Sequence, residues 1–83
     1  MDKEFVKDLC DKELEYMFLC SLISADNVNS EKDANDMLNY LAEFEEALNE
    51  SDVDKTKKDE LNHFIKKSRD ILNKDIKRFE ESK

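Results

Sequence analysis

The chain has 83 residues, carries 22 acidic and 14 basic side chains for a net charge of −8, and contains no glycine and no proline. A chain of this length forms at most one domain, and the lack of glycine excludes the glycine-rich loops that cradle nucleotide phosphates. The excess of acid argues against direct binding to nucleic acid or to an anionic membrane, since both contacts need lysine and arginine.

Charged residues make up 43% of the chain and hydrophobic residues 39%, a composition close to that of disordered proteins. Seven aromatic residues and a regular helical spacing of apolar residues favour a folded domain instead. We therefore predict an all-α fold in a single domain over residues 1–83. The predicted architecture is a small three-helix bundle that runs up, down and up, built from a long helical hairpin and a third helix, with helices at about 3–24, 31–49 and 53–81.

The first predicted helix, 3–24, follows Asp2 as its N-cap and contains a run over residues 16–23 in which seven of eight residues are apolar. At 100° per residue this helix shows two nearly opposite apolar faces. One face comprises Phe5, Leu9, Tyr16, Leu19 and Ile23. The other face, with Met17 beside it, comprises Leu14, Phe18 and Leu22. In a monomeric bundle one of the two faces stays exposed, so Leu14, Met17, Phe18 and Leu22 are a candidate surface for a partner or a second copy; the alternative is that they are internal core.

Residues 24–30 lack periodicity and are rich in Asn, Asp and Ser, which predicts a turn with Asn27 or Asn29 in the left-handed conformation. The second predicted helix, 31–49, is capped by Ser30 and carries one apolar seam at spacings of three and four residues: Ala34, Met37, Leu41, Phe44 and Leu48. Its acidic band comprises Asp33, Asp36, Glu43, Glu45, Glu46 and Glu50. This band is either a solvated face, which we favour, or an imitation of a phosphate row that blocks a nucleic-acid-binding protein.

The third predicted helix, 53–81, is capped by Ser51 or Asp54 and has one apolar stripe: Leu61, Phe64, Ile65, Ser68, Ile71, Leu72, Ile76 and Phe79. Lysine and arginine crowd the rest of its second half. No exposed aromatic residues interleave with them to stack on bases, so a solvated face is favoured over a surface for RNA or an acidic partner.

Few residues of the chain have side chains arranged for catalysis or metal binding. Glu60 and His63 have the spacing used in di-iron bundles, but the motif occurs once and His63 lies opposite the apolar stripe, so a surface histidine is favoured over a metal ligand. Cys10 and Cys20 would lie about 15 Å apart on one helix, too far for a disulfide, and are interpreted as small buried hydrophobes. We expect no cofactor, no metal and no enzymatic activity.

The expected function is therefore that of a non-catalytic interaction module, which binds and regulates or inhibits a protein partner, or self-associates, through the first helix. The alternatives are an acidic nucleic-acid mimic, a secretion-type chaperone and a small structural subunit. An acidic amino terminus, unlike that of a signal peptide, and an apolar run too short to cross a bilayer predict a cytoplasmic location.

Overall fold

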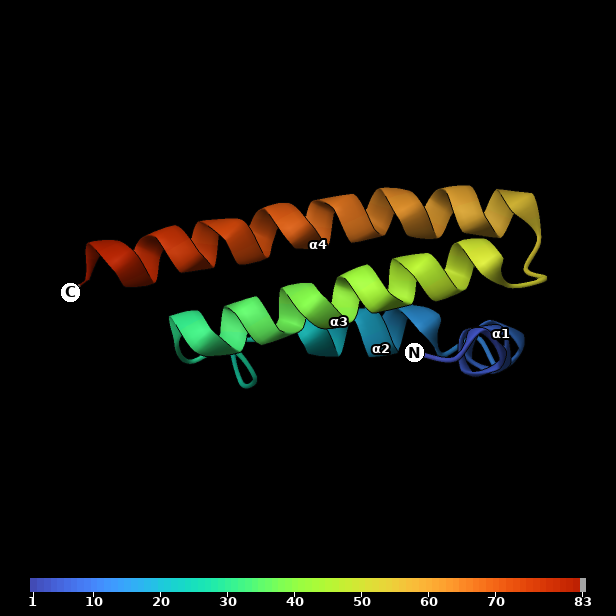
Figure 1. Cartoon of the computed structure of the whole chain (residues 1–83), viewed down its shortest axis with the longest axis horizontal. Helices are drawn as coiled ribbons and strands as arrows, with labels where there is room; N and C mark the ends of the chain where they lie inside the picture. Colours follow the sequence, from blue (N-terminus) through green and yellow to red (C-terminus); the bar gives the residue numbers. More distant parts are fainter. Residues whose placement is uncertain (83) are drawn as a thin grey trace.

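The computed structural model describes residues 1–82 and has four α-helices: α1 (Lys3–Asp11), α2 (Glu15–Leu22), α3 (Glu31–Glu50) and α4 (Lys55–Glu81). The predicted all-α class is confirmed for these residues. The molecule is a rod of 44 × 18 × 17 Å, and its long axis follows α3 and α4 (Figure 1).

The helices α3 and α4 form an antiparallel hairpin joined by residues 51–54 (Figure 1). The predicted Ser30 cap is confirmed, because its hydroxyl accepts a hydrogen bond from the Asp33 amide at 3.2 Å. The helices pack through leucines, isoleucine and phenylalanine at heptad-like spacing, and each of these side chains is fully buried: Leu41, Phe44, Leu48, Leu61, Ile65 and Leu72. Burial of a side chain of this size contributes about 1.5–3 kcal/mol, so this seam is the main source of stability.

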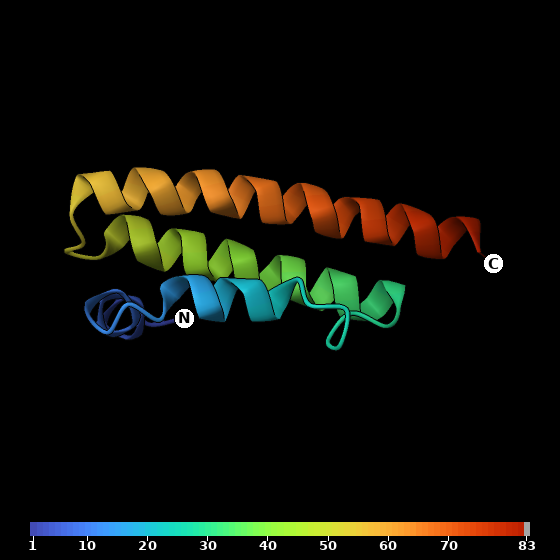
Figure 2. The same ribbon diagram turned by 180° about the vertical axis from the view of Figure 1, so that it is seen from behind.

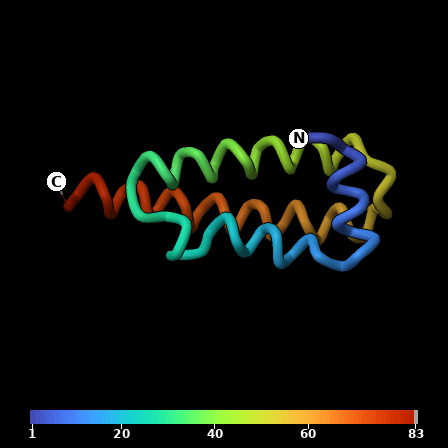
Figure 3. The backbone as a smooth tube through the Cα atoms, turned by 90° about the horizontal axis from the view of Figure 1, so that it is seen from below, coloured from blue at the N-terminus to red at the C-terminus, as the bar shows by residue number. Residues whose placement is uncertain are grey.

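The helices α1 and α2 cover one side and one end of the hairpin. Viewed from below, α4 lies behind and between α2 and α3, while α1 crosses the end where α3 turns into α4 (Figure 3). The view from behind shows α2 running alongside α3 in the opposite direction (Figure 2). The third helix of the rod is thus the short α2, not a helix that starts at residue 3.

The prediction of one continuous helix over 3–24 is wrong, because the chain turns sharply between α1 and α2. Glu13 has a φ of 58°, and it is the one non-glycine residue with a positive φ among residues 1–82. The Glu13 amide donates to the Cys10 carbonyl at 3.1 Å, and the Leu14 amide donates to the Leu9 carbonyl at 2.8 Å. These two bonds define a Schellman motif, in which glycine usually occupies the left-handed position.

Packing explains why the chain turns there. Lys57, in the first turn of α4, bonds to Glu15, so α2 begins level with the closed end of the hairpin. A straight helix that began at residue 3 would extend past this end by about 18 Å, at 1.5 Å per residue. Folding α1 across the end instead buries Val6 completely.

The expectation that Asn27 or Asn29 is left-handed is also wrong, since neither has a positive φ. Both act through their side chains instead. The Asn27 amide group donates to the Ser21 carbonyl in the last turn of α2 at 2.6 Å, and that of Asn29 donates to the Asp26 carbonyl at 3.3 Å. Asn27 thereby satisfies a carbonyl that a helix end leaves without an intrahelical partner.

Candidate partner-binding surface

Within α2, the residues of the two predicted apolar faces lie on the two flanks of one wide face that packs on α3 and α4, whereas Phe5 and Leu9 of the first predicted face lie on α1. The Phe18 ring stacks on the Phe44 ring of α3 with centroids 5.6 Å apart. On the other flank, the Tyr16 ring meets the Phe64 ring of α4 edge-on at 5.2 Å. A helix seated between two neighbours must present apolar groups to both, which explains the double pattern.

Glu15 lies between these flanks and is 2% exposed. It shares the buried face of α2 with Leu19 and Leu22, four and seven residues later. The Lys57 ammonium donates to Glu15 Oε1 at 2.5 Å and lies 5.8 Å from the centre of the Tyr16 ring, while Glu15 Oε2 has no hydrogen-bond partner among the described residues. The hydrogen bond from Lys57 to Glu15 raises the pKa of Lys57 above its usual value, so the ammonium stays charged at neutral pH.

The four residues predicted to bind a partner are divided by this packing. Leu22 is 7% exposed and belongs to the core. Phe18 is partly buried between Phe44 and Phe5. These two residues are therefore placed as the alternative prediction had it, in which this face belongs to the core. Leu14 and Met17 remain on the surface, 38% and 71% exposed.

An exposed apolar patch nevertheless exists at the junction of α1 and α2. We define the apolar patch as Phe5, Leu14, Met17 and the outer edge of Phe18. The Phe5 ring meets the Phe18 ring edge-on at 5.6 Å, and Leu14 lies one helical turn from both Met17 and Phe18. Sequence reasoning placed Phe5 on the opposite face, because it assumed one uninterrupted helix.

The predicted acidic band is also divided. The Asp33 carboxylate accepts a hydrogen bond from the backbone amide of Asn29 at 3.1 Å. Asp36 forms an ion pair with Lys32 at 3.0 Å, and Glu45 forms one with Arg69 of α4 at 3.3 Å. The remaining three acids are exposed, form no ion pair within residues 1–82, and lie on one stripe of α3 at spacings of three and four residues. We call Glu43, Glu46 and Glu50 the acidic row.

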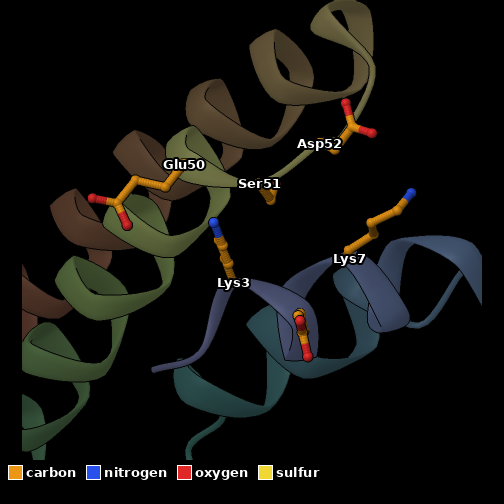
Figure 4. A pocket seen from close by; sticks show the side chains of 6 residues that line it. Lys3, Lys7, Glu50, Ser51 and Asp52 are labelled. Carbon is orange, nitrogen blue, oxygen red and sulfur yellow. The ribbon is translucent and has the colours of Figure 1, made fainter.

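Two hollows flank α1 at the end of the hairpin. The first, of about 170 Å³, lies between the start of α1 and the end of α3, and its lining is mostly charged: Lys3, Glu4, Lys7, Glu50, Ser51 and Asp52 (Figure 4). The second, of about 340 Å³, includes Cys10 and Lys57. Burial, reinforced by the nearby Glu15 carboxylate, raises the pKa of the Cys10 thiol, which opposes thiolate formation and suits Cys10 poorly to nucleophilic chemistry.

The remaining candidate residues lie apart from these features. His63 is exposed on α4, and within residues 1–82 no cluster of three or more His, Cys, Asp or Glu side chains is arranged to hold a metal ion. In the same residues, no helix combines the length and the apolar character needed to span a bilayer. Comparison of the chain with protein-family models, curated proteins and solved structures finds no match.

Proposed function

We propose that this protein is a non-catalytic interaction module that binds and regulates another protein through the apolar patch. The observation that carries the proposal is Met17, which is 71% exposed and lies one helical turn from Leu14, itself 38% exposed, in a chain that is otherwise highly charged. Exposed contiguous apolar surface marks interaction sites, and methionine adapts its shape to a partner. Burial of an apolar side chain of this size contributes about 1.5–3 kcal/mol to binding before the costs of association.

The proposal extends to architecture and location. We propose that α2, α3 and α4 act as an up-down-up three-helix unit, with α1 as a cap that completes the patch at one end. The free state of both cysteines supports a cytoplasmic location, where thiols stay reduced.

A photo-crosslinking amino acid at position 17 tests the proposal directly. In extracts of the native source, we expect a discrete protein adduct from position 17 and none from position 67, which is exposed on α4. Because Met17 packs little, Met17→Asp should remain folded by circular dichroism and should compete poorly for the adduct. Absence of a position-specific adduct, or full competition by Met17→Asp, would refute the proposal.

The nucleic-acid mimic receives less support than protein binding. The acidic row places three free carboxylates within about 10 Å of helix. Double-stranded DNA carries one charge per about 1.7 Å of its axis, so the row falls well short of that charge density.

A further inference from the structure

The connection between α1 and α2 folds against the preference of its own sequence. Residues 11–15, Asp-Lys-Glu-Leu-Glu, contain no helix breaker. We call residues 12–14 the hinge. Its left-handed residue, Glu13 with a φ of 58°, adopts a conformation that is unfavourable for any residue with a Cβ atom. Leu14 is the N-cap residue of α2, and no side chain caps this helix. A straight hinge would remove the left-handed residue and give the first amides of α2 intrahelical acceptors.

The contacts that hold α1 on the hairpin are apolar, and an identical hairpin end offers all of them. Val6 is fully buried, and the Phe5 ring meets the Phe18 ring of α2 edge-on at 5.6 Å. Within residues 1–82, the ion pairs of α1 are local and join residues four apart: Lys7 with Asp11, and Asp8 with Lys12. When α1 leaves the hairpin it therefore keeps its ion pairs and loses only apolar contacts.

The seat of α1 on the hairpin is incompletely filled, because hollows of about 170 Å³ and about 340 Å³ flank it. Leaving this seat empty is nevertheless unfavourable, since Val6 and the apolar surface beneath it would meet water. A helix of nine residues is also too short to be stable alone. An α1 that leaves its own hairpin is therefore stable only as a continuation of α2, with its apolar side on another hairpin.

From these observations we infer that two copies of the chain exchange α1. In each copy of this exchanged dimer, α1 and α2 form one straight helix over residues 3–22, and α1 lies across the closed end of the other hairpin. A straight helix passes its own closed end by about 18 Å, which brings α1 to a second copy there. Because α1 lies crosswise to α2 (Figure 1, Figure 3), the two rods meet at their closed ends with their long axes crossing.

The exchange completes each apolar patch with a residue from the other copy. Phe5 comes from one chain, whereas Leu14, Met17 and Phe18 belong to the other. The inference goes beyond the proposed function, which requires only that the patch is exposed.

Opposing effects set how much exchanged dimer forms. Each dimer relieves two left-handed residues and adds helical hydrogen bonds in both copies. Association costs translational and rotational freedom, and the two copies repel each other because each carries a net charge of −8. The monomer is therefore favoured in dilute solution. The dimer fraction should rise with protein concentration and with salt, which screens the repulsion.

Contact between Phe5 of one chain and Phe18 of another is the signature of exchange, because in the monomer both rings belong to one chain. The sample is an equal mixture of ¹³C-labelled and unlabelled protein, combined in denaturant, refolded and concentrated. Light scattering after size exclusion should give a dimer of twice 9.8 kDa, in a fraction that grows across a hundredfold range of concentration. Isotope-filtered nuclear Overhauser spectra of the isolated dimer should show the Phe5 ring of one chain close to the Phe18 ring of the other.

Two substitutions at the hinge act in opposite directions. Glu13→Gly removes the cost of the left-handed conformation and disfavours a straight helix, whereas Glu13→Ala keeps that cost and favours a straight helix. The dissociation constant of the dimer should therefore be larger for Glu13→Gly than for Glu13→Ala by about tenfold or more, since each dimer contains two hinges. Both substitutions remove the same charge, so the repulsion between copies is equal in the two variants.

A monomer at every concentration would overturn the inference, as would a dimer in which the contact between Phe5 and Phe18 stays within one chain. Equal dissociation constants for Glu13→Gly and Glu13→Ala would overturn it as well, because a dimer formed through another surface does not depend on the hinge. The proposed function is tested separately, by the crosslink from position 17 to a different protein.

Discussion

Replacing Lys57 with methionine should destabilise the protein strongly, although Lys57 itself is partly exposed. Its side chain is 31% exposed, whereas the Glu15 carboxylate that it pairs with is 2% exposed and has one oxygen already without a partner. Without Lys57 both carboxylate oxygens would be buried and unpaired. Removal of one partner from a buried ion pair costs about 3–5 kcal/mol. A domain of this length has a total stability of about 4–12 kcal/mol, so the variant should be marginally folded or unfolded.

The double variant, Glu15→Met with Lys57→Met, tests the cause. It removes the buried charge and fills the same space with apolar groups, a replacement that is often neutral or stabilising, so it should recover most of the lost stability. The assay is urea denaturation followed by helical circular dichroism. Lys74→Met is the control, because Lys74 is exposed and such surface substitutions stay within about 0.5 kcal/mol. A Lys57→Met variant as stable as Lys74→Met, or a double variant no better than Lys57→Met, would refute the buried pair.

The remaining predictions concern the turn, the core and the titrating groups. Glu13→Gly should raise the free energy of unfolding by about 0.5–1 kcal/mol, because φ is 58° at this position, whereas Glu13→Ala should give no such gain in the same urea assay. Leu41→Ala should lower the unfolding free energy by about 2–5 kcal/mol and shift the urea midpoint accordingly, since Leu41 is fully buried. The pKa of Lys57 is raised in the folded protein, so the stabilisation from its pair is complete below about pH 10.5 and is lost as the pH rises through the folded pKa. The stability difference between the native protein and Lys57→Met should therefore be constant from pH 7 to about pH 10 and should shrink as the pH rises above about 10.5. Ellman's reagent at neutral pH should modify the exposed Cys20 before Cys10, whose pKa is raised by burial, and Cys20→Ser should retain only the slow reaction.

Some features that depend on nearby residues were accessible from sequence, whereas the conformation of Asn27 and Asn29 in the turn was not. Ser30 caps α3 as predicted, and the Asp2 carboxylate accepts the Glu4 amide at 3.0 Å at the start of α1. The predicted bounds of the two long helices, 31–49 and 53–81, lie within two residues of α3 and α4. The acidic row was accessible only in part, because which acids pair depends on Arg69 in another helix as well as on Lys32 one turn away.

Sequence alone therefore specifies the Asp2 and Ser30 caps, the heptad-like seam and the all-α class, because hydrogen bonds and apolar periodicity act within a few residues. Of the two residues predicted to cap the last helix, Asp54 is the N-cap residue of α4 but its side chain makes no capping hydrogen bond, and Ser51 ends α3. The tertiary structure determines the conformation and the packing of the chain between Cys10 and Leu22. The closed end of the hairpin leaves no surface for a straight helix to cover, so the chain turns at Glu13 even though glutamate suits that conformation poorly. The same end supplies Lys57, and only this contact from 42 residues away allows Glu15 to occupy the middle of a buried face. The two groups of apolar residues that flank Glu15 on α2 therefore form one packed face, because α2 contacts both α3 and α4.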